Sequence, residues 1–258
     1  AARNPRLVYG RVTGWGQTGP MADQVGHDIN YIALSGALYP MGSGDQPPPP
    51  PLNLIGDYGG GAMILVSGVL AALLEAKTTG RGRIVDAAMT DGSALLTSLF
   101  HALRARGLWG DQRGANLLDG GAPFYRCYAC RDGGFVAVGA LEPRFYAALI
   151  NGLGLTPEEA PQFDRDGWPA LQARFAALFA ARDRDDWAAH FAGTEACVTP
   201  VLTLTEAANH PHNRARATFI EAGVVQPAPA PRFAEKPSPV SAQRLSLPLD
   251  QALKNWLA

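Results

Sequence analysis

The feature that most limits how this chain can fold is a long apolar stretch, GGGAMILVSGVLAALLEAK, at residues 59–77. A stretch of this length and composition forms either a membrane-spanning helix or a helix in the core of a protein. It starts with three glycines, meets Glu75 and Lys77 near its end, and stops at TTGRG. We therefore predict a buried core helix from about Gly59 to Lys77 and no membrane span.

Two short apolar segments and a proline-rich segment lie around this helix. LVYGRV, residues 7–12, and GRIVDAAM, residues 82–89, predict strands, and the second strand is expected to be buried. INYIALSG, which follows Asp28, predicts a short helix, and residues 91–107 predict another. Five consecutive prolines, residues 47–51, exclude a helix or a central strand and predict an extended surface segment.

The composition changes at residue 108, where a glycine-rich connector begins. FYRCYACRDGGFVAVGAL, residues 124–141, alternates around RDGG and predicts a β-hairpin. EPRFYAALINGLGL, residues 142–155, predicts an amphipathic helix with an early proline and a late glycine. One or two more helices are expected over residues 169–192. Together these elements predict a small α+β unit.

The predicted division of the chain has four parts. They are a large-domain part (residues 1–107), a linker (108–125), a small α+β domain (126–212), and a proline-rich return linker with a C-terminal helix that docks on the large domain (213–258). The chain has no initiator methionine and enters a predicted strand almost at once. A chain that begins on a sheet strand is expected to lack earlier strands of that sheet, so we expect a fragment of a longer protein.

Charge and cysteine content argue against several classes of protein. The net charge is −1, and no basic block or stripe occurs, which argues against nucleic-acid binding. No N-terminal charged-then-apolar signal is present, so the expected compartment is the cytoplasm. Cys127 and Cys130 form one C-x-x-C pair, but no second pair lies near and the pair falls in the predicted hairpin. We therefore expect no metal site.

Asp57 stands in NLIGDYGGG, residues 53–61, between a glycine and the glycine run that enters the long helix. Each helical glycine costs about 1 kcal/mol relative to alanine, and is tolerated where a ligand or a second backbone passes close by. Free N–H groups at a helix start would stabilise a developing oxyanion. The alternative is that Asp57 is an N-cap and the glycines form a packing face, and the sequence leaves both interpretations open.

His27 stands in VGHDINYIALSG, residues 25–36, and is either a general base or a structural residue at a helix start. Glu142 comes just before a proline at a predicted helix start, where a carboxylate complements the helix dipole. The other histidines are expected to be structural, and they are His101, His190, His210 and His212. No G-x-S-x-G elbow, Walker loop or H-E-x-x-H helix is present, which removes the commonest hydrolase, nucleotide-triphosphate and zincin interpretations.

Seven motifs in this order resemble one enzyme family along essentially the whole chain. They are GRVTGWGQTGP, GHDINYIALSG, PPLNLIGDYGGG, VDAAMTDGS, RGANLLDGGAPFY, FVAVGALEPRFY and CVTPVLTLTEA. The chain is similar to the α-methylacyl-CoA racemases of the family III CoA-transferase superfamily. The resemblance implies an α/β fold with a Rossmann-like large domain, a small α+β domain, and an interlocked homodimer with active sites at the subunit interface. The family's N-terminal section, which holds the first strands of the sheet, is expected to be missing here.

The resemblance also implies the roles of the candidate site residues. The family's catalytic pair falls on His27 and Asp57, and its histidine-supporting glutamate falls on Glu142. Positions that line the coenzyme A pocket fall on Gly26, Asp28 and Tyr31. The helix start at Gly59 and Gly60 is expected to bind substrate by holding the enolate oxygen.

The implied function is an isomerase of fatty acid and lipid metabolism, which racemises 2-methylacyl-CoA thioesters by two-base proton transfer through an enolate. Acyl-CoA is the expected partner, and no separate cofactor or metal is required, because coenzyme A is part of the substrate. One alternative is a family III CoA-transferase in which Asp57 is the nucleophile. Another is a truncated, inactive chain that only dimerises.

Overall fold

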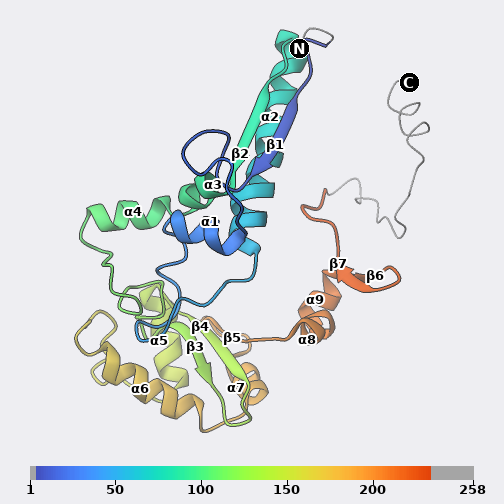
Figure 1. Ribbon diagram of the computed structural model, residues 1–258. Helices are drawn as coiled ribbons and strands as arrows, with labels where there is room; N and C mark the ends of the chain where they lie inside the picture. Colours follow the sequence, from blue (N-terminus) through green and yellow to red (C-terminus); the bar gives the residue numbers. More distant parts are fainter. Residues whose placement is uncertain (1–3, 234–258) are drawn as a thin grey trace. The chain divides into compact units, whose positions relative to one another are not determined.

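The computed structural model describes residues 4–233 and divides the chain into two units, Ala1–Pro200 and Val201–Ala258. The first unit contains, in chain order, β1 (Tyr9–Thr13), α1 (Asp28–Leu34), η1 (Leu54–Met63), α2 (Ile64–Thr79), β2 (Ile84–Ala88), α3 (Met89–Leu96), α4 (Ser98–Ala105), β3 (Tyr125–Ala129), β4 (Phe135–Gly139), α5 (Pro143–Gly152), α6 (Trp168–Phe179), α7 (Arg184–Phe191) and β5 (Val198–Pro200) (Figure 1). The C-terminal helix predicted at residues 247–258 lies outside the described residues. The domain boundaries expected from the sequence stay a prediction.

The two strands predicted around the long helix form a parallel pair. β1 pairs with β2 in register from Tyr9 opposite Ile84 to Thr13 opposite Ala88. Parallel strands need a long crossover, and here it holds α1, η1 and α2. Close packing of α2 on the pair depends on Gly68, because a Cβ there would lie 2.7 Å from Cγ1 of Val85. The helix therefore lies directly on the strands.

The long helix differs from its prediction in where it begins and in how much of it is buried. It starts at Leu54 rather than Gly59, because its first ten residues form the π-helix η1, which continues into α2. It ends at Thr79 rather than at Lys77, within the predicted stop TTGRG, where Gly80 takes the left-handed conformation with φ 72°. Ala72 and Ala76 are buried, whereas Leu74 on the other side of α2 is 67% exposed. The prediction of a buried helix is thus met on one face only.

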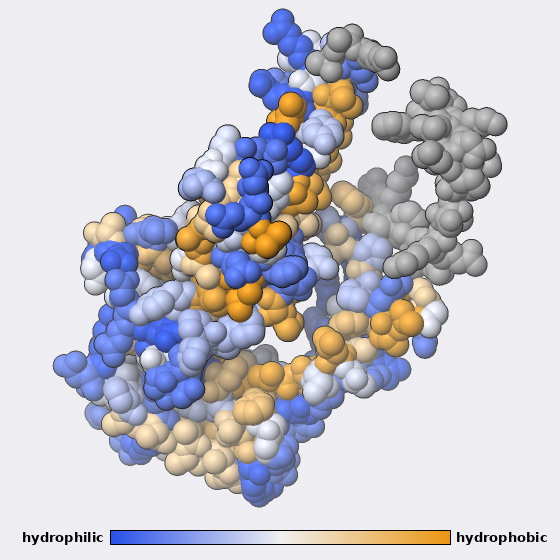
Figure 2. All heavy atoms as spheres, in the orientation of Figure 1, coloured by the Kyte–Doolittle hydropathy of each residue, from blue (hydrophilic) through white to orange (hydrophobic). Residues whose placement is uncertain are grey.

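The exposed face of this helix is strongly apolar. Hydrophobic residues reach the surface in the part of the molecule that β1, β2 and α2 form (Figure 2). Leu54–Thr79 is long and apolar enough to cross a membrane by length and composition, with mean hydropathy 1.7 in its most apolar 18 residues. A core helix of a soluble protein can pass the same test. The expectation of no membrane span stays a prediction.

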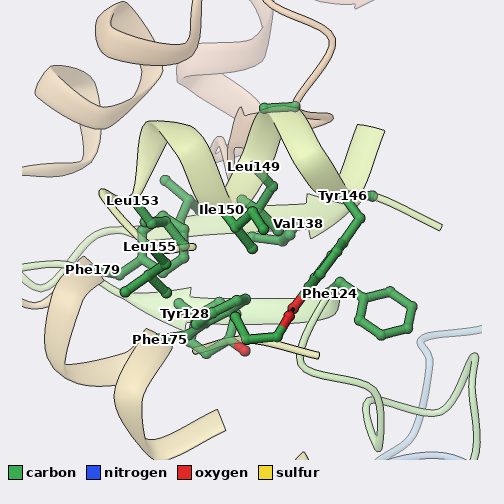
Figure 3. Packing of buried hydrophobic residues seen from close by; sticks show 14 of the residues in the cluster. Phe124, Tyr128, Val138, Tyr146, Leu149, Ile150, Leu153, Leu155, Phe175 and Phe179 are labelled. Atoms are coloured by element: carbon green, nitrogen blue, oxygen red, sulfur yellow. Dashed lines mark hydrogen bonds between the residues drawn. The ribbon is translucent and has the colours of Figure 1, made fainter. Parts of the chain in front are cut away.

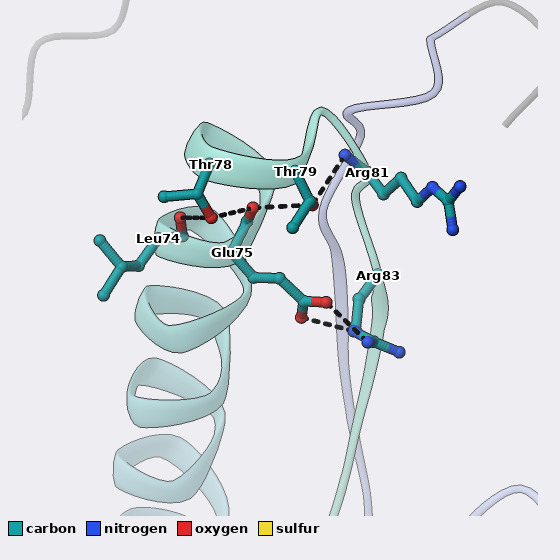
Figure 4. A network of polar contacts seen from close by, with 6 residues as sticks. All are labelled: Leu74, Glu75, Thr78, Thr79, Arg81 and Arg83. Atoms are coloured by element: carbon teal, nitrogen blue, oxygen red, sulfur yellow. Dashed lines mark hydrogen bonds and ion pairs between the residues drawn. The ribbon is translucent and has the colours of Figure 1, made fainter.

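Polar contacts join the end of α2 to the start of β2. Nε and Nη2 of Arg83 each donate to a carboxylate oxygen of Glu75 at 2.6 Å, and these bonds lower the pKa of Glu75 (Figure 4). The hydroxyl of Thr79 donates to the Glu75 carbonyl and accepts from the N–H of Arg81. The group is exposed, so its contribution to the free energy of unfolding is small, but it orients the turn.

The helix predicted over residues 91–107 is divided into α3 and α4. Thr97 lies between them with φ −88° and ψ 6°, outside the helical region. Its hydroxyl donates to the carbonyl of Ala94, and such local bonds compete with the helix backbone and bend it. The prediction of a single helix is therefore wrong at one residue.

The largest hydrophobic core lies in the small α+β part. β3 and β4 form the predicted hairpin, and β5 pairs with β4. Helices α5, α6 and α7 and the segments that connect these elements contribute the rest of the core. Phe124 is fully buried and meets the rings of Tyr146 and Trp168 at 5.3 and 5.8 Å between centroids. Figure 3 shows how the side chains of this core face one another. Burial raises the pKa of Tyr146 to about 12.

The second unit, as far as residue 233, is made of short elements. They are α8 (Leu204–Asn209), α9 (Pro211–Ala215), β6 (Phe219–Glu221) and β7 (Val225–Pro227), and the two strands pair antiparallel. Thr203 and Glu206 cap α8 reciprocally: the Thr203 hydroxyl accepts from the N–H of Glu206, and the Glu206 carboxylate accepts from the N–H of Thr203.

Candidate active site

His27 is the N-cap residue of α1, and its side chain is exposed. Its extended backbone, with φ −132° and ψ 176°, turns the chain into the helix. Its N–H donates to Oδ1 of Asn30 at 3.0 Å, and its carbonyl accepts from the N–H of Asn30 at 2.8 Å. The backbone of His27 is therefore held in place while the imidazole stays accessible, as a general base requires.

Asp57 lies in the first turn of η1 and is half-buried. Its Oδ2 accepts a hydrogen bond from Nδ2 of Asn53 at 3.1 Å. Asn53 is a site residue that our reading of the sequence missed. The signal was present, because residues four apart on a helix face one another and NLIGD places an amide and a carboxylate at that spacing.

Asp28 joins the segment of His27 to the segment of Asp57. Its Oδ2 accepts the N–H of Gly56 at 2.7 Å and the N–H of Asp57 at 2.8 Å. The residue is only 6% exposed. A Cβ on Gly56 would lie 2.7 Å from the same carboxylate oxygen, so only glycine fits there. Two residues 30 positions apart in the sequence are thus brought to neighbouring helix N-termini.

Tyr31 of α1 contacts the residue that precedes His27. Its hydroxyl donates a short hydrogen bond to the carbonyl of Gly26, and its ring meets Trp15 edge-on at 4.7 Å. Burial and the negative charge of Asp57 raise the pKa of Tyr31. A Cβ on Gly26 would come within 3.0 Å of both aromatic rings, so the glycine before His27 has a packing reason. The pocket-lining roles expected for Gly26, Asp28 and Tyr31 stay predictions.

The glycine run packs against a second backbone, which was one of the two alternatives that the sequence left open. Gly60 is buried, and a Cβ on it would lie 2.6 Å from the N of Ser93. Conversely, a Cβ on Gly92 would lie 1.9 Å from the carbonyl oxygen of Gly60. The contact between η1 and α3 therefore depends on glycine at both positions.

The expected oxyanion site at the start of a Gly59 helix needs correction. Gly59 lies in the middle of η1, so it is not a helix start. In the first turn, the N–H groups of Gly56 and Asp57 already donate to Asp28. The prediction was wrong because it placed the start of the helix at the glycine run. The helix begins at Leu54, and the carboxylate of Asp28 accepts the N–H groups of its first turn. Substrate binding by Gly59 and Gly60 stays a prediction, but a helix N-terminus at Gly59 no longer supports it.

Substituting Gly92 tests how tightly η1 and α3 are packed. We expect Gly92→Ala to lower the free energy of unfolding by about 1–3 kcal/mol, because the new methyl group would collide with the Gly60 backbone. Helix propensity alone predicts that Gly92→Ala raises the free energy of unfolding, because alanine favours a helix more than glycine does. Urea denaturation monitored by circular dichroism measures the change. Gly139→Ala is the matched control, since nothing lies within 4 Å of a Cβ at that position. An unchanged midpoint for Gly92→Ala would show that this contact is loose.

Glu142 lies in the small α+β part as the N-cap residue of α5, and it is exposed. After burial, its charge is the main cause that raises the pKa of the Cys197 thiol. Within residues 4–233, no hydrogen bond or ion pair joins Glu142 to His27 or Asp57. Its role in supporting the histidine stays a prediction.

A cavity of about 240 Å³ lies at the other end of α1. Its walls include Tyr39, Phe100 and Trp109, and neither His27 nor Asp57 lines it. The candidate pair lies instead at the surface, where an exposed imidazole and a half-buried carboxylate stand near two helix N-termini. Such a pair can exchange protons with a bound substrate. In the described part of the chain, no group of three or more His, Cys, Asp or Glu side chains could hold a metal ion.

The chain is similar to proteins of known family. The family model for CoA-transferase family III matches residues 1–248. The chain is 48% identical to "Alpha-methylacyl-CoA racemase" of Mus musculus and 46% identical to that of Homo sapiens, each over 93% of this chain and 64% of the relative. It is 33% identical to "Acetyl-CoA:oxalate CoA-transferase" of Acetobacter aceti, over 86% of this chain and 58% of the relative.

A solved structure shares the fold. The CAIB/BAIF family protein from Brucella suis superposes with a TM-score of 0.71 at 23% identity, covering 100% of this chain and 69% of that chain. The likeness shows a mixed α/β fold of this kind. The chain spans about 64% of the length of the two racemases.

Proposed function

The chain belongs to CoA-transferase family III, and from this premise we propose that it is part of an isomerase that racemises 2-methylacyl-CoA thioesters. The names of the two mammalian relatives support the reaction. The structural observation that supports it most is the bridge from Asp28 to the N–H of Asp57 at 2.8 Å, because it brings the His27 segment and the Asp57 segment together. A racemase of this kind needs two proton-transferring groups near one carbon.

The proposed mechanism uses one group on each face of the α-carbon. The neutral imidazole of His27 removes the α-proton, and the thioester becomes an enolate. The protonated carboxyl of Asp57 then delivers a proton to the opposite face, and the reverse reaction exchanges the two roles. Asn53 and Asp28 hold the Asp57 side chain and backbone, respectively. In this proposal Glu142 supports the histidine within an interlocked homodimer, whose active sites lie at the subunit interface.

The remaining parts of the proposal follow from the substrate. Coenzyme A belongs to the acyl-CoA partner, so the reaction consumes no separate cofactor and requires no metal. Gly26, Asp28, Tyr31, Gly59 and Gly60 are the candidate substrate-binding positions. We place the enzyme in fatty acid metabolism in the cytoplasm.

A CoA-transferase is the second candidate, and relatives with that name favour it. In that reaction the Asp57 carboxylate would attack the thioester carbonyl, forming an acyl anhydride and releasing the coenzyme A thiolate. The thiolate would then attack the aspartyl carbonyl of the anhydride, forming an aspartyl-CoA thioester and releasing the original acyl group as a carboxylate. The acceptor carboxylate would attack this thioester, forming a second anhydride and releasing the thiolate again. Attack of the thiolate on the acceptor's acyl carbonyl would give the new acyl-CoA and free Asp57. This chemistry does not need His27 as a base.

Deuterium exchange separates the two candidates. The protein is incubated with a 2-methylacyl-CoA in deuterated water without a carboxylic acid acceptor, and we expect deuterium at the α-carbon by mass spectrometry. A 2,2-dimethylacyl-CoA has no α-proton, so it is the matched control and should gain none. Acyl transfer that depends on an added free acid, with no exchange in its absence, would favour the transferase instead.

A further inference from the structure

The side chain of Asp28 accepts hydrogen bonds from a segment that is distant in the sequence. It follows the exposed His27, yet it is itself 6% exposed and points toward a different helix. Its Oδ2 accepts two backbone N–H groups, from Gly56 and Asp57, at 2.7 and 2.8 Å. Hydrogen bonds to an ionised acceptor are shorter and stronger than neutral ones, and the N-terminus of a helix favours a negative charge. The carboxylate therefore stabilises the first turn of η1.

The side chain of Asp28 is turned away from solvent with both of its oxygens. Oδ1 is also buried and has no hydrogen-bond partner among the residues that the structure describes. A carboxylate in this position cannot reach a ligand at the surface without breaking its two bonds to η1.

We propose that Asp28 is a positioning residue, whose carboxylate holds Asp57 at the correct place relative to His27. The inference rests on the proposed function, because it assigns the two positioned groups to proton transfer. His27 caps α1, Asp28 is the first residue of α1, and its carboxylate bonds the N–H of Asp57 itself. No other residue is needed between His27 and Asp57 to fix their relative position.

The contact also requires that residue 56 has no side chain. A Cβ there would lie 2.7 Å from Oδ2 and 2.9 Å from Cγ of Asp28, so a larger residue would displace the carboxylate. The nearest other atom, Cγ2 of Ile32, is farther away at 3.2 Å. Gly56→Ala should therefore act mainly through Asp28.

Steady-state racemisation of one enantiomer of a 2-methylacyl-CoA by the full chain tests the role of Asp28. We expect Asp28→Ala to lower kcat about 100-fold, with KM changed less than about threefold, because misplacing one group costs rate rather than binding. Asp28→Asn keeps an oxygen acceptor for both N–H groups, so it should restore kcat to within about tenfold of the unsubstituted protein. Asp91→Ala removes an exposed first-turn carboxylate of α3 and should leave kcat unchanged. A rise in KM with unchanged kcat in Asp28→Ala would overturn the proposal and make Asp28 a substrate contact.

A double-mutant cycle tests the partnership with Gly56. We expect Asp28→Ala and Gly56→Ala together to lower kcat no more than Asp28→Ala alone, because the added methyl has no carboxylate left to displace. Multiplicative losses would show that the two residues act independently and would contradict the proposal.

Amide hydrogen exchange by NMR separates this inference from the proposed function. The N–H groups of Gly56 and Asp57 should exchange about tenfold faster in Asp28→Ala, whichever reaction the protein catalyses. Unchanged protection at both amides would refute the positioning role. Protection lost in Asp28→Ala, combined with no α-proton exchange in the unsubstituted protein, would leave the positioning role intact and refute the racemase.

Discussion

Replacing His27 with alanine or Asp57 with asparagine will each lower the rate at which one enantiomer of a 2-methylacyl-CoA is racemised by about 10²–10⁴-fold. General acid–base catalysis contributes about 10²–10⁴-fold to a rate, and the proposed reaction needs a proton-transferring group on each face of the carbon. Each substitution leaves one face without such a group, so the racemisation rate should fall by about that factor, while the remaining group can still exchange the proton on its own face. Chiral chromatography of the acid released from the thioester measures the fall.

Both variants should fold normally, which keeps the result interpretable. His27 is exposed, and Asp57→Asn retains an oxygen that can accept from Asn53. Circular dichroism and the thermal midpoint should therefore match the unsubstituted protein. His101→Ala, another exposed histidine, is the matched control and should racemise the substrate normally. Racemisation at the unsubstituted rate in either site variant would remove that residue from the mechanism. The pattern also separates the candidate reactions, because a transferase would lose activity with Asp57 and keep it without His27.

Phe124→Ala will lower the free energy of unfolding of the small α+β part by about 3–5 kcal/mol. The ring is fully buried and touches Tyr146 and Trp168, so truncation removes apolar contacts and leaves a cavity that the hairpin and helices cannot fill without moving. A loss of this size is a large fraction of the total stability of a domain. Urea denaturation followed by tryptophan fluorescence reports it, because Trp168 and Trp187 both belong to this core.

The matched control uses the same residue type on the hairpin that Phe124 leads into. Phe135 begins β4 and is 50% exposed, so Phe135→Ala should cost far less than the buried substitution. Equal losses for the two variants would contradict the assignment of Phe124 to the centre of this core.

The elements that the sequence predicted correctly depend on nearby residues. The hairpin β3–β4 turns at RDGG, as its alternation and glycines indicated. The helix α5 has its proline in the first turn, as expected from a residue whose missing N–H costs nothing there. The family could also be recognised from the sequence, because seven short motifs in a fixed order identify it without any knowledge of the fold. Placing His27 and Asp57 in one site came from that resemblance, since each residue alone had an equally good structural explanation.

Contacts between distant segments decided the rest. η1 begins at Leu54 and not at Gly59, with Asp28 bonding its first turn from 28 positions away, and the glycines of η1 face α3. The inward direction of the Asp28 carboxylate and the bond from Asn53 to Asp57 also needed coordinates. Periodicity and propensity describe how a segment behaves with its own neighbours. Where a buried carboxylate finds its donors depends on which segments the folded chain brings together, and only the tertiary structure contains that information.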